Sequence, residues 1–130
     1  MNDTIFGKIS RGDIPATKVY EDDKFLAFLD INPVTKGHTL LLPKEHFVWI
    51  EDVPNDLLGE IFIKVKELIK AITTGTGCDL VQVLIEGKDV PHFHIHLIPA
   101  MLDHRNAVWE RAIYKEGEKE LFAEKIKNNL

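Results

Sequence analysis

Three histidines stand at alternate positions in one short stretch of the chain. Residues 92–99 read His-Phe-His-Ile-His-Leu-Ile-Pro, so single apolar residues separate His92, His94 and His96. Alternate side chains of a β-strand point to the same face, whereas each step of two residues in a helix turns by about 200°. The spacing therefore predicts a strand with three imidazoles on one face and apolar side chains on the other. Imidazole takes up or releases a proton near neutral pH, so this face is a candidate for chemistry.

Packing and metal binding are two possible roles for this row. If the three histidines were purely structural and buried, one face of the strand would have to offer hydrogen-bond partners to six ring nitrogens, which is difficult to satisfy. Alternating histidines on a strand can also ligate zinc, and His38 or His46 could supply a further ligand. Asp103 and His104 are additional potential ligands in a predicted loop. Because no Cys-x-x-Cys or His-Glu-x-x-His pattern completes a familiar set, we expect no metal.

Attack on phosphorus is the third possible role, and the pattern favours it. A neutral imidazole nitrogen is a competent nucleophile, provided that its other nitrogen is protonated and held in place. Neighbouring imidazoles can hydrogen-bond the phosphate oxygens and protonate the leaving group. Because the nucleophile must be neutral, activity should fall as the pH drops through the histidine range near about 6.5.

The elements that must position these histidines follow from local patterns. A short helix is expected over residues 3–9 with Asp3 or Thr4 as its cap. Apolar residues at helical spacing predict one long helix from Pro54, ended by Gly75 and Gly77. The remaining predicted elements are strands over 18–21, 24–29, 38–43, 80–85 and 92–99, an irregular segment anchored by Trp109, and a helix over 115–127. This order predicts an α+β fold, an antiparallel sheet with helices on one side.

Length and composition narrow the class of protein. The 130 residues suit a single domain over 1–130. A formal net charge of −5 with only three arginines argues against non-specific nucleic-acid binding. A lone cysteine, Cys78, excludes an internal disulfide. No signal peptide and no apolar run of about 18 residues is present in the sequence. We therefore expect a cytoplasmic protein without membrane contact.

The histidine stretch resembles the signature of the histidine-triad (HIT) family, His-φ-His-φ-His-φ-φ with φ apolar. Further stretches are similar to the Hint-like branch, in the bacterial or archaeal type, and occur in the right order. They are Thr4-Ile5-Phe6-Gly7-Lys8-Ile9, Asp13-Ile14-Pro15-Ala16, Glu21-Asp22-Asp23, Phe28-Leu29-Asp30-Ile31-Asn32-Pro33 and Gly37-His38-Thr39-Leu40-Leu41-Leu42-Pro43-Lys44-Glu45-His46. The resemblance covers nearly the whole chain.

The resemblance implies a fold and an activity. HIT-like domains are α+β, with a five-stranded antiparallel sheet and one long helix, here followed by a C-terminal helix. Hint-like members are homodimers that join two sheets. They bind purine nucleotides and cleave at the α-phosphate of nucleoside phosphoramidates, adenylates or dinucleoside polyphosphates through a nucleotidyl-histidine intermediate, without a cofactor. The chain is therefore expected to be a hydrolase or nucleotidyl transferase. The alternative is a catalytically weak HIT module that binds a nucleotide or a protein.

The resemblance also implies a role for each residue of this sequence that matches a functional position of the family. His94 would be the nucleophile, His92 and His96 would flank the phosphate, and His38 would support the network. Asp30 would bind the ribose hydroxyls. Nucleotide contacts are further expected from an apolar wall and from the segment before the triad, although core packing alone is an equal alternative for each wall residue. These positions are Ile5, Phe6, Ile9, Phe28, Leu29, Asp89 and Val90.

Three departures from the family pattern are visible. Thr4 and Gly7 stand where many bacterial relatives carry zinc-binding cysteines, so that zinc site should be absent. The approach to the triad, residues 84–91, is shorter than in relatives and lacks their phosphate-contacting Asn. Asp89 replaces a Ser or Glu there, so it either points away from the phosphate or faces a cationic leaving group. The Hint C-terminus is replaced by a loop and a helix.

Overall fold

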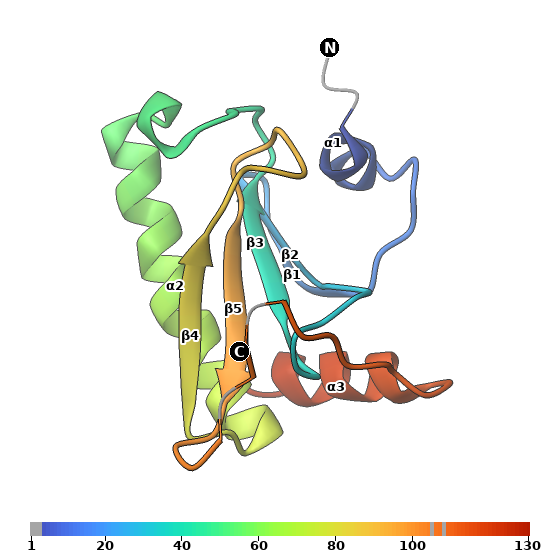
Figure 1. Cartoon of the computed structure of the whole chain (residues 1–130). Coiled ribbons are helices and arrows are strands. Elements are labelled where there is room, and N and C mark those ends of the chain that lie inside the picture. The colour runs from blue at the N-terminus through green and yellow to red at the C-terminus, as the bar shows by residue number, and fades with distance from the viewer. Residues whose placement is uncertain (1–3, 105, 108) are drawn as a thin grey trace.

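The computed structural model describes residues 4–104, 106–107 and 109–130 and has an α+β architecture (Figure 1). Within these residues five strands form one antiparallel sheet in the order β1-β2-β3-β5-β4. The elements are α1 (Ile5–Ser10), β1 (Lys18–Glu21), β2 (Phe25–Leu29), β3 (Thr39–Pro43), the 3-10 helix η1 (Ile50–Asp52), α2 (Asn55–Thr76), β4 (Leu80–Ile85), β5 (Ile95–Ala100) and α3 (Glu118–Lys127). The predicted fold class is confirmed, with element boundaries shifted by one to three residues in most cases.

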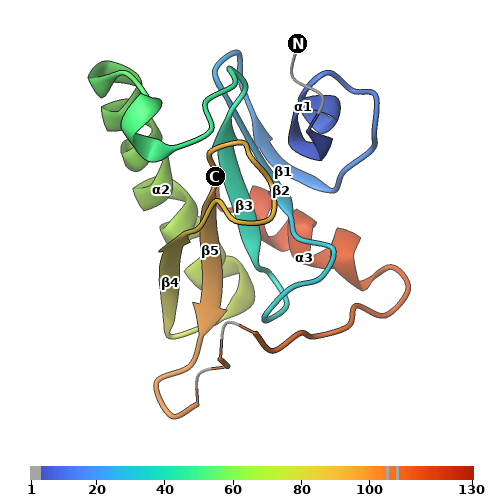
Figure 2. The ribbon, with the colours of Figure 1, turned by 45° about the horizontal axis from the view of Figure 1, so that its top comes forward.

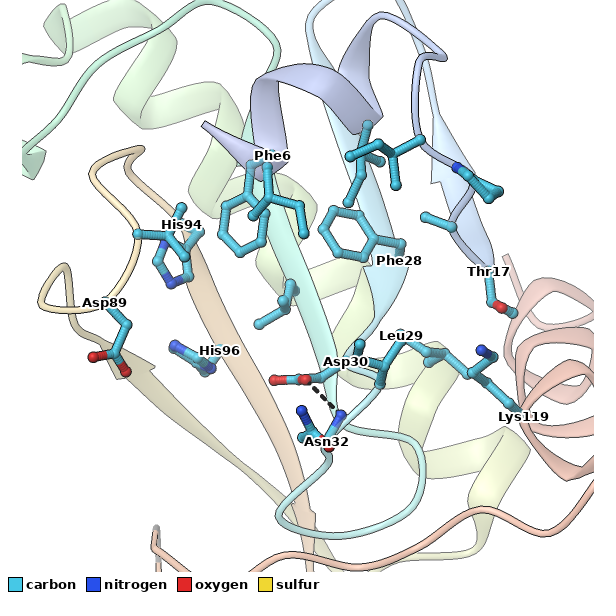
Figure 3. A pocket seen from close by; sticks show the side chains of 18 of the residues that line it. Phe6, Thr17, Phe28, Leu29, Asp30, Asn32, Asp89, His94, His96 and Lys119 are labelled. Atoms are coloured by element: carbon cyan, nitrogen blue, oxygen red, sulfur yellow. Dashed lines mark hydrogen bonds between the residues drawn. The ribbon is translucent and has the colours of Figure 1, made fainter. Parts of the chain in front are cut away.

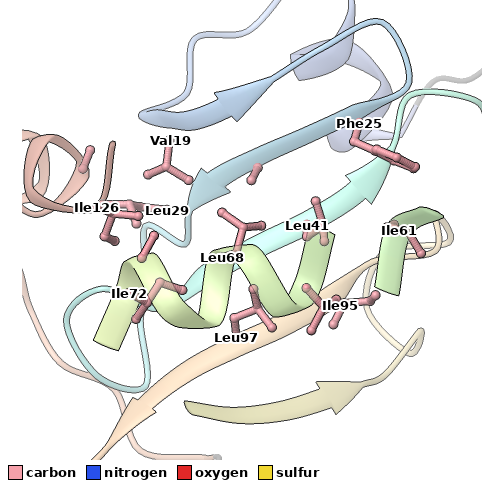
Figure 4. Close-up of a cluster of buried hydrophobic side chains, with 14 of the residues drawn as sticks. Val19, Phe25, Leu29, Leu41, Ile61, Leu68, Ile72, Ile95, Leu97 and Ile126 are labelled. Carbon is pink, nitrogen blue, oxygen red and sulfur yellow. The ribbon is translucent and has the colours of Figure 1, made fainter. Parts of the chain in front are cut away.

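The sheet is covered on both faces, which corrects the expectation of helices on one side only. The main core lies between the sheet and α2, with Leu41, Ile95 and Leu97 facing Leu68 (Figure 4). Helix α1 packs on the opposite face and lies across the sheet from α2 (Figure 2). The reason is the unbroken apolar run of β2, in which all five residues are buried, so both faces of this strand need cover.

Helix α2 runs through Gly75, where the sequence predicted its end. It continues to Thr76 and stops at Gly77, whose φ of 77° is left-handed. Gly75 allows close contact with α3, because a Cβ built there would lie 2.6 Å from the carbonyl oxygen of Lys125. Gly75 is therefore an interior residue of α2 that allows α3 to pack closely against it. No helix in the described part of the chain is long and apolar enough to span a membrane.

The histidine strand begins at Ile95, three residues later than predicted, so only His96 of the triad belongs to β5. Leu41 pairs with Ile95 in the β3–β5 register, and continuing that register would pair Pro43 with Phe93. Proline has no N–H to donate, so the ladder cannot continue there. Instead, the N–H of Phe93 donates to the carbonyl oxygen of Phe47 at 2.6 Å. The alternation of faces nevertheless persists, because Phe93 packs into the main core.

The two ends of the chain are held by specific contacts. The Thr4 hydroxyl caps α1 by accepting the N–H of Gly7 at 3.1 Å; Asp3, the other predicted cap, lies outside the described residues. The C-terminal segment crosses the loop that joins β2 to β3, and Trp109 is 80% exposed there, so the predicted aromatic anchor is wrong. The anchor of that segment is Tyr114, whose hydroxyl accepts the N–H of Gly37 at 2.8 Å.

Candidate active site

A cavity of about 420 Å³ opens on the α1 side of the sheet (Figure 3). All eight residues assigned to nucleotide contacts from the sequence line it: Ile5, Phe6, Ile9, Phe28, Leu29, Asp30, Asp89 and Val90. His94 and His96 line it as well, whereas His92 and His38 do not. The fold thus brings the expected apolar wall, the carboxylate of Asp30 and two of the triad imidazoles around one space.

The ring of His94 is held by a main-chain hydrogen bond. Its Nδ1 lies 2.6 Å from the carbonyl oxygen of His92. A carbonyl can only accept, so Nδ1 carries the proton, and Nε2 of the neutral ring holds the lone pair. The Phe6 ring packs edge-to-face with the imidazole, with ring centroids 4.8 Å apart. This is the tautomer that a nucleophilic Nε2 requires.

The tautomer of His96 is set through His38. The N–H of Val34 donates to Nδ1 of His38 at 3.0 Å, so the proton of that neutral ring sits on Nε2. Nε2 of His38 lies 2.9 Å from Nδ1 of His96 and therefore donates to it. His96 must then carry its own proton on Nε2. The chain of two hydrogen bonds provides an N–H donor in the cavity wall beside His94.

Burial keeps these imidazoles uncharged at neutral pH. It lowers the pKa of His38 to about 3, aided by the charges of His96, Arg111 and His94. Burial, with His94 and Arg111, also lowers the pKa of His96 to about 4. Burial lowers the pKa of His94 as well, although the His92 carbonyl and nearby carboxylates oppose that shift. The lone pair of His94 is therefore available at neutral pH.

His92 does not line the cavity. Its ring is fully buried, and its Nε2 donates to the carbonyl oxygen of Pro43 at 2.8 Å. It packs against the rings of Phe6 and His46. The His92 imidazole therefore does not line the cavity, whereas its carbonyl oxygen orients His94. His46 binds the Pro91 carbonyl oxygen at 2.8 Å in an exposed position.

One group of potential metal ligands converges in the described part of the chain. Atoms of Asp30, His38 and His96 lie within 4.8 Å of one another. His38 cannot serve as a neutral ligand in this arrangement, because Nδ1 already accepts the Val34 N–H and Nε2 carries the ring proton. A metal at Nε2 would require an imidazolate, so the chemistry of these donors favours the hydrogen-bonded pair.

Besides Asp30 and Asp89, which the sequence predicted, the cavity wall contains charged residues that the sequence did not indicate. Asp30 accepts the Asn32 N–H at 2.9 Å, and burial raises the pKa of its carboxyl group. Glu86, Arg111 and Lys119 also line the cavity. Arg111 and Lys119 come from the C-terminal segment, for which no local pattern indicated a position near the triad.

The comparisons with known proteins agree with this geometry. Residues 11–101 match the family model described as HIT domain. The chain belongs to the HIT family. A Hit-like protein from Bartonella henselae, solved by crystallography, superposes on this HIT chain with a TM-score of 0.91 at 32% identity, covering 100% of this chain and 98% of that one.

Curated relatives belong to the Hint-like branch of the HIT family. Adenylylsulfatase HINT3 of Arabidopsis thaliana is 38% identical over 113 residues, which cover 83% of this chain and 56% of that protein. The chain thus spans a little over half the length of the Arabidopsis relative. Adenosine 5′-monophosphoramidase hnt1 of Schizosaccharomyces pombe is 41% identical over 100 residues, covering 73% of this HIT chain and 72% of the yeast protein.

Proposed function

We propose that this chain is a nucleotide hydrolase or nucleotidyl transferase that cleaves at the α-phosphate through a covalent nucleotidyl-His94 intermediate. The observation that carries the proposal is the hydrogen bond from Nδ1 of His94 to the His92 carbonyl oxygen, which leaves the Nε2 lone pair to attack. Relatives named adenylylsulfatase and adenosine 5′-monophosphoramidase support nucleotide hydrolase activity. The expected ligand is a purine nucleotide.

The reaction has two steps. In the first, Nε2 of His94 bonds to the α-phosphorus while the bond to the leaving group breaks; the leaving group keeps that electron pair and takes a proton from solvent. In the second, water attacks the α-phosphorus, the phosphorus–Nε2 bond breaks, and His94 regains its lone pair. One water is consumed overall, and its hydrogens end on the leaving group and the nucleotide. The Nε2–H of His96 donates to a phosphoryl oxygen as charge develops.

The acidic residues near His94 bear on the choice of leaving group. Asp89 and Glu86 line the cavity, and their charges oppose the lowering of the His94 pKa. Carboxylates so placed repel an anionic leaving group and attract a cationic one. Among phosphoramidates, adenylates and dinucleoside polyphosphates, this charge pattern favours phosphoramidates of amines.

The direct test uses a fluorogenic adenosine phosphoramidate. Turnover should be lost in His94→Ala while binding of adenosine 5′-monophosphate is retained, and a chelator should leave wild-type turnover unchanged. His104→Ala is the matched control, because His104 is exposed and does not line the cavity. Nucleotide binding without turnover of any phosphoramidate, adenylate or dinucleotide would instead identify a binding module.

We further infer a homodimer through the edge of the sheet. Strand β4 is the last strand in the sheet order, and Val83 and Ile85 on it are 44% and 40% exposed. An exposed edge with apolar side chains is a ready pairing surface. Sedimentation velocity should give a dimer for the natural chain and a monomer for the double variant Val83→Lys, Ile85→Lys. A monomeric natural chain would contradict this assembly.

A further inference from the structure

We propose that Arg111 and Lys119 form a subsite for a second phosphate, carried on the 2′ or 3′ oxygen of the nucleotide's ribose. The inference rests on the proposed function, in which Asp30 faces the ribose. It concerns the part of the cavity that the C-terminal segment builds, and it assigns a substrate class, ribose-phosphorylated nucleotides, to that part.

Contacts with the β2–β3 loop hold the C-terminal segment in place. The N–H of Ala112, next to Arg111, donates to the Pro33 carbonyl oxygen at 2.7 Å. Lys36 forms an ion pair with Glu118 at 2.9 Å, beside Lys119. This loop joins Asp30 to His38, so the contacts fix the two basic residues relative to the carboxylate expected to bind the ribose.

The side chains of Asp89 and Lys119 lie on different sides of the cavity (Figure 3). The acidic side chains of Glu86 and Asp89 lie near His94, and their charges act on its imidazole. Figure 3 places Lys119 across Asp30 from Asp89, beside Leu29 and Thr17. A second anionic group on the nucleotide is therefore repelled on the triad side and attracted on the side of the C-terminal segment.

Arg111 and Lys119 differ in their interactions with other residues of the protein. The charge of Arg111 opposes the rise that burial causes in the pKa of Asp30, and it also acts on His38 and His96. Lys119 is half-buried in the cavity wall, and it makes no hydrogen bond or ion pair with any residue that the structure describes. An ammonium group held at a cavity wall without a carboxylate partner is suited to an incoming phosphate.

The position of Asp30 decides between the ribose and the leaving group as the carrier of this phosphate. The leaving group must depart from the α-phosphate beside His94, where Glu86 and Asp89 lie. In a nucleotide the ribose is bonded to the α-phosphate, and it is expected at Asp30. Its hydroxyl oxygens are the next atoms along the molecule that can carry a phosphate. Lys119 and Arg111 line the same cavity as Asp30, and Figure 3 shows Lys119 on the side of Asp30 away from Asp89.

Binding of isomeric nucleotides tests the subsite. Adenosine 5′-monophosphate is compared by titration calorimetry with adenosine 5′-diphosphate and with adenosine 2′,5′- and 3′,5′-bisphosphate, which are isomers of the diphosphate. At least one bisphosphate should bind about tenfold tighter than the monophosphate, or about 1.4 kcal/mol, whereas the diphosphate should gain little. Lys119→Ala should remove most of that gain. Lys127→Ala, which removes a lysine at the far end of α3, should preserve it.

The outcomes separate this inference from the hydrolase itself. An equal gain for the diphosphate would put the second phosphate on the leaving-group side and overturn the subsite. No gain for either bisphosphate, or a gain that survives Lys119→Ala, would overturn it as well. Tight bisphosphate binding without any phosphoramidate turnover would refute the hydrolase and leave the subsite standing. Failure of all four nucleotides to bind would refute both.

Discussion

Replacing His38 by leucine should lower kcat/KM by about 10- to 100-fold without touching the nucleophile. The substitution removes the donor to Nδ1 of His96 and the acceptor for the Val34 N–H. A buried polar group that loses its partner costs about 1–3 kcal/mol, and each 1.4 kcal/mol is a factor of about ten. His96 would then be free to place its proton on Nδ1 and present a lone pair, which repels the phosphoryl oxygen.

The assay is steady-state hydrolysis of an adenosine phosphoramidate by His38→Leu and His38→Gln. Glutamine offers both an amide donor for His96 and a carbonyl acceptor for Val34, so it should recover most of the lost rate. Calorimetric affinity for adenosine 5′-monophosphate should change less than kcat in both variants. Equal losses in the leucine and glutamine variants, or a leucine variant at wild-type rate, would refute the tautomer reasoning.

Three further predictions follow from burial and packing. Because burial lowers the pKa of His94, the acid-side fall of kcat/KM should be centred below the ordinary histidine pKa of about 6.5; a fall centred above that value would contradict this. The unfolding free energy, measured with urea, should fall as the pH drops from about 6.5 toward 3: the unfolded His38 takes a proton over this range, whereas the folded one, with a pKa of about 3, does not. His38→Gln should flatten that dependence. Gly75→Ala should lower the free energy of unfolding by about 1–2 kcal/mol, since crowding against Lys125 outweighs the gain in helix propensity. Gly59→Ala, with open space around its Cβ, should raise it by up to about 1 kcal/mol; equal effects would contradict the close contact between the helices.

Local patterns in the sequence were sufficient for most of the fold. The strands and α2 follow from apolar periodicity, which depends on neighbouring residues alone. The start of β5 could not be predicted this way, because it depends on Pro43, which lies far from the triad in sequence. Gly75 looked like a helix end, since only the packed structure reveals α3 against it.

The candidate site, like the fold, could be predicted only in part from the sequence. The triad spacing and the family resemblance identified the residues that gather around the cavity, but not that His92 turns its ring to Pro43. Arg111 and Lys119 carried no sequence signal, because tertiary contacts of an irregular segment determine their positions. Trp109 was predicted to anchor the segment because it is a large aromatic residue, but its side chain is exposed. Tyr114 anchors the segment instead, through the hydrogen bond between its hydroxyl and Gly37.

The interruption of the ladder at Pro43 has a consequence for how durable the site is. It leaves the carbonyl oxygens of Pro43 and His92 available to imidazole N–H groups. A peptide oxygen does not titrate, so the group that orients the nucleophile is the same in acid and in base. It also belongs to the backbone, so no exchange of the side chain at position 92 can delete it. An enzyme that oriented its nucleophile with an aspartate side chain could lose that contact by protonation of the carboxylate or by substitution of the residue.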